Sequence, residues 1–191
     1  MSDRAFAGKR NVKGLKKFGT ENENRQKMPA PKKEIFISHG KDQEPLNELK
    51  KMLMEFGLKP VVLSEQPSGG KTVMEKLEAY SDVGFAFVIL TPDDLGGFVE
   101  MGSKWSRPQR LRKFLKTAHT RPRQNVVLEF GYFVGKLGRN RVTCLLKKPV
   151  EQPSDMQGIV YLSFKESMEE IRAEILKELE AAGFRVPAET T

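Results

Sequence analysis

One carboxylate stands out as a candidate for chemistry. Glu129 is the only charged residue in the stretch Gln124–Gly135, which is otherwise apolar on every face of a helix. Such a helix is normally buried, and a carboxylate is seldom buried unless it is paired or put to use. Two interpretations stay open from the residues alone. Glu129 acts on a ligand, or it forms a structural ion pair with Arg121 or Arg123 or accepts hydrogen bonds at the helix start.

Two acidic residues and a histidine also follow predicted strands. Asp93 and Asp94 follow the apolar run 83–90 after Thr91 and Pro92, where some α/β folds place a metal pair or a phospho-accepting aspartate. Turn chemistry after Thr91 and Pro92 explains the same pair. A receiver-type site would also need acidic residues after the first strand, and there the chain has Ser38–Asp42 instead. His39 and His119 are the only histidines, too few to indicate a metal site. We predict no metal, and keep a metal-dependent phosphatase using Asp93 and Asp94 as an alternative.

The segment Gly69–Thr72 looks like the end of a phosphate-binding loop. A complete loop of this kind needs a glycine five residues before Gly70, and that position holds Glu65. A loop ending at a helix N-cap explains the segment better, since Thr72 and Glu75 have the spacing of a capping box.

The elements that must position these residues alternate between strands and helices. Hydrophobic periodicity predicts strands at 34–38, 60–63, 83–90, 141–146 and 159–162, and helices at 46–56, 72–81, around Glu129 and at 168–182. Short connections between them imply an α/β domain over residues 33–187, with about five parallel strands and helices on both faces. Ligands bind such sheets at the carboxyl ends of the strands. One crevice should therefore be bordered by 38–42, 64–72, 91–97 and the start of the Glu129 helix.

The net charge of +8 is concentrated in two segments. Residues 1–32 carry nine Lys and Arg against three acids and predict a disordered basic leader, while 95–123 carries eight against one and predicts a flexible surface loop. Neither segment interleaves aromatic residues with its charges, so we do not expect nucleic-acid binding. A single cysteine, Cys144, and the lack of a signal peptide or membrane-length apolar run predict a cytoplasmic protein with no membrane contact. We expect residues 188–191 to form a short tail.

Several motifs occur in the order of one known family. They are Ile35–Asp42, Glu65–Pro67, Thr72–Glu78, Val83–Asp94 and Arg123–Gly131. Together they resemble the bacterial TIR-like domain of predicted nucleotide-binding proteins, found in anti-phage effectors such as bacterial STING and Pycsar TIR proteins. The resemblance extends from about Lys33 to Val186. It implies a flavodoxin-like TIR fold and an NAD+ glycohydrolase that cleaves the nicotinamide–ribose bond.

The resemblance also implies roles for individual residues. Glu129 would be the catalytic glutamate, and NAD+ would be the substrate, so no separate cofactor is expected. The substrate-binding residues would be Ser38, His39, Gly40, Asp42, Gln66, Pro67, Asp93 and Asn125. Lys41 departs from the family, which often has arginine there, and a lysine cannot fork across a phosphate in the same way.

Cleavage of an N-glycosidic bond develops positive charge on the ribose, so a fixed carboxylate beneath the sugar would stabilise the transition state. The resemblance further implies that activity requires self-association, with 64–70 as both lid and contact surface. Effectors that this chain resembles usually carry a second domain that binds a cyclic nucleotide, and residues 33–187 leave no room for one. We therefore expect an upstream nucleotide-sensing partner or domain. The alternative is a non-catalytic TIR-type interaction or nucleotide-binding module, in which Glu129 forms a structural ion pair.

Overall fold

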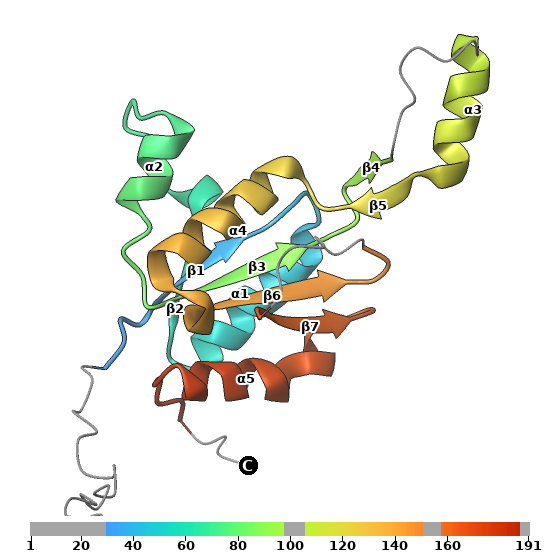
Figure 1. Cartoon of the computed structure of the whole chain (residues 1–191). Helices are drawn as coiled ribbons and strands as arrows, with labels where there is room; N and C mark the ends of the chain where they lie inside the picture. The colour runs from blue at the N-terminus through green and yellow to red at the C-terminus, as the bar shows by residue number, and fades with distance from the viewer. Residues whose placement is uncertain (1–29, 98–105, 151–157, 188–191) are drawn as a thin grey trace, which may run out of the picture.

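In a computed structural model of the chain, residues 30–97, 106–150 and 158–187 are described. A five-stranded parallel sheet forms the centre of the domain (Figure 1). Its strands, in spatial order, are β2 (Lys59–Val62), β1 (Glu34–Ser38), β3 (Phe85–Leu90), β6 (Val142–Lys147) and β7 (Val160–Phe164). Counted along the chain this is the order 2-1-3-4-5, that of flavodoxin-like folds. The predicted fold class is confirmed.

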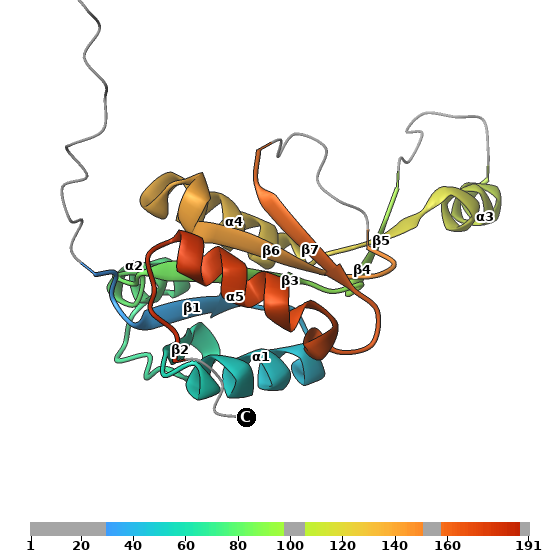
Figure 2. The ribbon, with the colours of Figure 1, turned by 90° about the horizontal axis from the view of Figure 1, so that it is seen from below.

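Helices cover both faces of the sheet, as the view in Figure 2 makes clear. The helices are α1 (Gln43–Glu55), α2 (Val73–Ala79), α4 (Gln124–Leu137) and α5 (Arg172–Ala181), the last preceded by a 3-10 turn at Met168–Ile171. α1 and α5 pack on one face, and α4, together with Leu77 of α2, packs on the other. Successive strand residues point to opposite faces, so Phe87 belongs to the α1–α5 core and Val88 to the α4 core.

β3 lies in the middle of the sheet, between β1 and β6. All six of its residues are buried, which explains why its sequence is apolar on both faces. The predicted capping box is also present: the Thr72 side chain accepts from the Glu75 backbone N–H, and the Glu75 carboxylate accepts from the Thr72 backbone N–H at 2.8 Å. Because β1 and β3 are parallel neighbours, their carboxyl ends lie at the same edge of the sheet.

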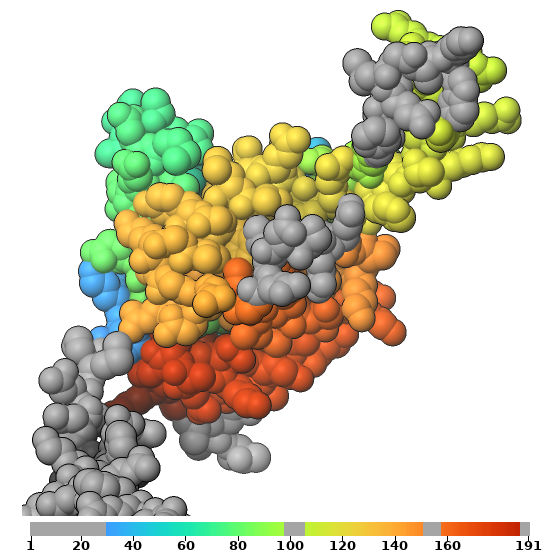
Figure 3. All heavy atoms as spheres, in the orientation of Figure 1, coloured from blue at the N-terminus to red at the C-terminus, as the bar shows by residue number. Residues whose placement is uncertain are grey.

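The prediction of a flexible loop over 95–123 is wrong for its described residues. An antiparallel ribbon, β4 (Asp94–Gly96) with β5 (His119–Arg121), carries the helix α3 (Arg107–Thr117). Figures 1 and 3 show α3 projecting from the body of the domain. A capping box of Ser106 and Gln109 begins α3, and the ribbon depends on pairing between residues far apart in sequence, which local periodicity does not detect. We call residues 94–97 and 106–121 the arm.

α4 is not buried on all sides, contrary to the prediction. Its buried residues are Val126, Phe130 and Phe133, spaced to form one face, whereas Leu128 keeps 58% of its surface exposed. Apolar composition alone therefore overstated the burial of this helix. Glu129 lies at the edge of the buried face, partly covered.

Two predictions fall on residues outside the described ranges. They are the basic leader, of which only 30–32 are described, and the tail at 188–191. Within the described ranges, no helix is both long and apolar enough to cross a lipid bilayer.

Candidate active site

A cavity of about 340 Å³ opens at the carboxyl ends of β1 and β2. Its walls come from the loop after β1, the loop after β2, α2 and the first turns of α4. The lining residues are Ile37, His39, Gly40, Leu63, Ser64, Ser68, Lys71, Val73, Lys76, Arg123 and Glu129. The cavity lies beside β1, from which the chain runs outward to β2 on one side and to β3 on the other. Flavodoxin-like sheets bind ligands at this switch point.

Glu129 lines this cavity, and Ser38 holds it from behind the lining residues. Ser38 ends β1 and is 1% exposed, and its hydroxyl donates a hydrogen bond to Oε2 of Glu129 at 2.5 Å. The two residues are separated by 91 positions in the sequence. The sheet brings them together because β1 packs beneath α4, where Phe36 stacks against Phe133 with ring centroids 4.2 Å apart.

The environment of Glu129 disfavours its charge. Burial raises the pKa of the Glu129 carboxyl, and the hydrogen bond from Ser38 opposes this only in part. Among the described residues no cation forms a salt bridge with Glu129. Arg121 lies over Gly96 in the arm, and Arg123 lines the same cavity. The ion-pair explanation for Glu129 therefore has no support in this part of the chain.

His39 contributes a neutral ring to the cavity. Burial lowers the pKa of its imidazole, although a backbone hydrogen bond at Gly40 and the carboxylates of Glu65 and Asp93 act in the opposite direction. Its Nδ1 atom is buried and has no hydrogen-bond partner among the described residues. A neutral imidazole can donate from one nitrogen and accept at the other, so His39 can serve a hydroxyl of a bound ligand.

Gly40 lines the cavity and is in close contact with Asp93, which does not. A Cβ atom added to Gly40 would lie 1.7 Å from Oδ2 of Asp93, so only glycine fits there. The same Asp93 oxygen accepts a hydrogen bond from the Lys41 backbone N–H at 3.1 Å. Asp93 thus holds the loop after β1 in place and does not line the cavity itself.

Comparison with known proteins agrees with this architecture. A family model described as the CAP12/Pycsar effector protein, TIR domain, matches residues 34–166. The chain belongs to this TIR-domain family. It is 42% identical over 135 residues to the Uncharacterized protein YuaY of Escherichia coli (strain K12), covering 70% of this chain and 40% of YuaY. It is 33% identical over 148 residues to Protein tirC of Dictyostelium discoideum, covering 74% of this chain and 69% of tirC.

In this TIR domain, Asp93 and four more of the residues predicted to bind substrate neither line the cavity nor bond to Glu129. Asp42 caps α1 and forms a salt bridge with Lys147 at 2.7 Å. Gln66 donates from its side chain to the Val62 carbonyl at 3.3 Å, while Pro67 and Asn125 are exposed. Of the residues predicted to bind substrate, Ser38, His39 and Gly40 are the ones that the structure brings to Glu129 and its cavity.

Three cations of the cavity were not among the predicted site residues. They are Lys71 in the loop after β2, Lys76 on α2, and Arg123 at the N-cap of α4. Lys71 belongs to the segment that resembles a phosphate-binding loop, and Arg123 was considered only as a structural partner of Glu129. Nothing in the sequence indicated that Lys76 would line a cavity, because a lysine within a short helix is normally expected to face solvent. Lys41, the cation expected near a phosphate, is exposed and does not line the cavity.

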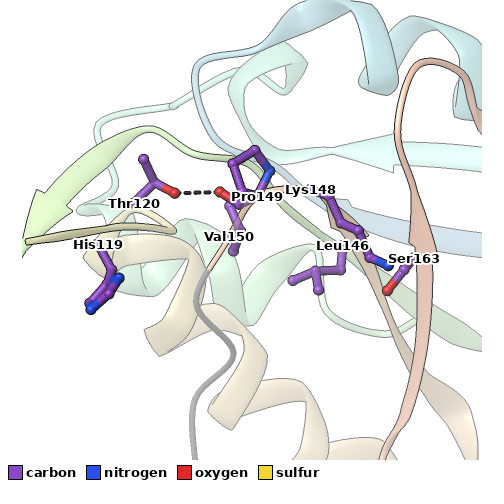
Figure 4. Close-up of a pocket in the computed structure, with 7 residues that line it drawn as sticks. All are labelled: His119, Thr120, Leu146, Lys148, Pro149, Val150 and Ser163. Atoms are coloured by element: carbon purple, nitrogen blue, oxygen red, sulfur yellow. Dashed lines mark hydrogen bonds between the residues drawn. The ribbon is translucent and has the colours of Figure 1, made fainter.

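A second cavity, of about 690 Å³, lies between the ribbon of the arm and the ends of β6 and β7 (Figure 4). It is lined by His119, Thr120, Leu146, Lys148, Pro149, Val150 and Ser163. The Thr120 hydroxyl points toward Pro149 and donates to its carbonyl oxygen (Figure 4). Although it is the larger cavity, none of these lining residues is a carboxylate. The smaller cavity at Glu129 is therefore the better candidate active site. Within the described ranges, no three His, Cys, Asp or Glu side chains are grouped to hold a metal.

Proposed function

We propose that this TIR domain is an NAD+ glycohydrolase that cleaves the nicotinamide–ribose bond. One observation carries the proposal: Glu129 lines a cavity at the ligand-binding edge of the sheet, held by Ser38 and without a cation partner among the described residues. Burying a carboxylate without a counter-charge is unfavourable. A substrate that develops positive charge during its reaction supplies the missing counter-charge.

The reaction follows from this geometry. As the bond between C1′ and the pyridinium nitrogen breaks, both bonding electrons leave with nicotinamide and the ribose acquires oxocarbenium character. An ionised Glu129 beside the ribose stabilises that charge more than it stabilises the ground state. Water then adds to C1′ and releases a proton, yielding ADP-ribose. Nicotinamide leaves as a neutral molecule, so a single carboxylate suffices and no general acid is required.

His39 suits the same substrate. Because its pKa is lowered, the ring is uncharged at neutral pH and does not repel the nicotinamide cation. His39 lines the cavity, where its ring can hydrogen-bond a ribose hydroxyl.

We further propose that the domain acts as a defence effector in the cytoplasm, where assembly switches it on. The description of its family as an effector supports this role. Control by an upstream nucleotide-sensing partner or domain would prevent continuous consumption of NAD+. The loop of residues 64–70 borders the cavity through Ser64 and Ser68, so contacts that this loop makes with a second copy would act directly on the site.

Incubation of concentrated protein with NAD+, with and without a metal chelator, tests the activity. We expect nicotinamide, followed by chromatography, to appear at the same rate in both samples. Release that stops with chelator would favour a metal-dependent reaction at Asp93 and Asp94. No release at any protein concentration, with or without a trigger, would favour a non-catalytic interaction module.

A further inference from the structure

The cavity that holds Glu129 also carries three positive charges. Lys71, Lys76 and Arg123 line it from three different elements. None of the three forms a salt bridge with a described carboxylate. The cavity therefore combines one carboxylate with a group of free cations, and a ligand that satisfies both must itself carry separated charges of opposite sign.

Lys76 is the most informative of the three. It is only 9% exposed, and lysines are almost never buried unless they are paired. Two other described lysines are partly buried, and each has a carboxylate partner: Lys147 with Asp42 and Lys50 with Glu65. Lys76 alone in this group has none, so its stem is packed in the protein while its charge is left for the cavity.

The helix that carries Glu129 adds to the positive field of the cavity. Arg123 is the N-cap residue of α4, no side chain caps this helix, and its first turn contains no acidic residue. An uncapped helix start presents backbone N–H groups and the positive end of the helix dipole. Arg123 thus places a guanidinium, which can bind two phosphate oxygens at once, at an already favourable position for an anion.

We propose that Lys71, Lys76 and Arg123 bind the diphosphate of the substrate, and that Lys76 determines the preference for a dinucleotide over a nicotinamide riboside. This inference rests on the proposed glycohydrolase function. Lys76 of α2 thus takes the place expected for Lys41 of the loop after β1, because Lys41 does not line the cavity. A cavity of 340 Å³ is near the lower limit for ligand sites. It therefore encloses the nicotinamide ribose and the adjoining phosphates, not the whole dinucleotide.

Substrate comparison in a Lys76→Gln variant tests the proposal. Nicotinamide riboside contains the same scissile bond as NAD+ and no phosphate. We expect kcat/KM for NAD+ to fall by about ten- to hundredfold, the usual effect of removing one charge-assisted hydrogen bond. The value for nicotinamide riboside should stay within about twofold of the parent. Equal losses for both substrates would overturn the proposal.

Two further variants guard against an effect on folding or on net charge. Lys76→Arg keeps the charge and should recover most of the preference for NAD+. Lys177→Gln removes a charge from the exposed surface of α5 and should leave both substrates unaffected. A loss in Lys177→Gln as large as that in Lys76→Gln would show that net charge, not the cavity, is responsible.

Calorimetric titration with inorganic pyrophosphate separates this inference from the proposed function. Binding that is present in the parent and weakened at least about tenfold in Lys76→Gln supports the diphosphate site even if NAD+ is not hydrolysed. Binding of equal strength in both proteins, or in neither, overturns the site even if nicotinamide is released.

Discussion

At the scale of single residues, Ser38 and Glu129 are the centre of the site. Burial favours the neutral form of Glu129, whereas the proposed reaction needs the ionised form, and the hydroxyl of Ser38 is the group that favours ionisation. Ser38 is buried and does not line the cavity, so it is expected to position the carboxylate and to limit the rise in its pKa rather than to contact the substrate.

The first prediction concerns the pH dependence of Ser38→Ala. Activity rises with pH as Glu129 loses its proton, and the lost hydrogen bond should raise the pKa of that carboxyl further. The acid limb of kcat/KM for NAD+ should move to higher pH. Ser64→Ala removes a hydroxyl that does line the cavity but makes no hydrogen bond to Glu129, so its acid limb should match that of the parent. An unshifted limb in Ser38→Ala would show that the hydrogen bond does not control ionisation.

A second prediction concerns the close contact between Gly40 and Asp93. Gly40→Ala forces a methyl group into the position of the Asp93 carboxylate and should lower the free energy of unfolding by about 1–3 kcal/mol, measured by urea denaturation. The loss should be smaller in an Asp93→Ala background, where the 1.7 Å contact is removed. Gly131→Ala is the matched control: no atom lies within 4 Å of its added Cβ, so it should stabilise α4 slightly. Equal losses for Gly40→Ala in both backgrounds would contradict this explanation.

Sequence reasoning reached some of these residues and not others. The rule that ligands bind at strand ends placed Ser38, His39 and Glu129 around one crevice, and the structure does bring them together. The same rule cannot tell which residues of a loop face inward, so Asp42 and Gln66, which bond to other parts of the fold, were grouped with them. Lys76 was missed because its burial depends on how α2 packs, which no local pattern records.

At the scale of elements, the strands and the capped helices were predictable because their signals are local. The apolar run of β3 and the capping box of α2 are both complete within a few residues. The arm was not predictable in the same way. Its ribbon pairs Asp94 with Arg121 across an intervening segment. α3 has no buried residue, and its apolar residues Leu111, Phe114 and Leu115 stand in a strongly basic segment that was interpreted as a surface loop.

The third prediction follows from the exposure of α3. A helix with no buried side chain gains little from tertiary packing and should open independently of the domain. In hydrogen exchange followed by mass spectrometry, amides of Arg107–Thr117 should exchange far faster than those of β3 or α4. Protection of α3 equal to that of β3 would mean that another part of the molecule covers it.

At the scale of the whole molecule, the proposed switch is assembly. Two apolar side chains at the start of α2, Val73 and Met74, are 68% and 44% exposed. Val73 lines the cavity, and both residues follow the loop of residues 64–70 by only a few positions. Such exposed apolar groups often mark contact surfaces. They give a physical basis for coupling association to the site.

The fourth prediction tests this coupling with two methionines. Met74→Gln should raise the protein concentration needed for half-maximal NAD+ consumption by about tenfold or more, since a buried methionine contributes about 1.5–3 kcal/mol. Met54 on α1 is 57% exposed and lies on the opposite face of the sheet, so Met54→Gln should behave like the parent. Light scattering over the same concentrations should show the matching change in size. Full specific activity in a dilute monomer would contradict the assembly model.

The central claim is that the carboxylate of Glu129 supports cleavage of NAD+, and nicotinamide release by Glu129→Gln tests it most directly. Glutamine still accepts the Ser38 hydrogen bond but cannot stabilise a ribosyl cation by its charge. We expect release to fall by at least about a hundredfold, with Glu174→Gln on the exposed side of α5 as an active control.

Stability measured alongside shows that the loss is not one of folding. Because the pKa of Glu129 is raised in the folded state, its ionisation lowers stability as pH rises through that pKa. Glu129→Gln should therefore be at least as stable as the parent at neutral pH. The difference should vanish at a pH low enough to protonate Glu129 in both the folded and the unfolded parent. A stable Glu129→Gln protein that releases almost no nicotinamide is the predicted result. Release at the parental rate would contradict the account.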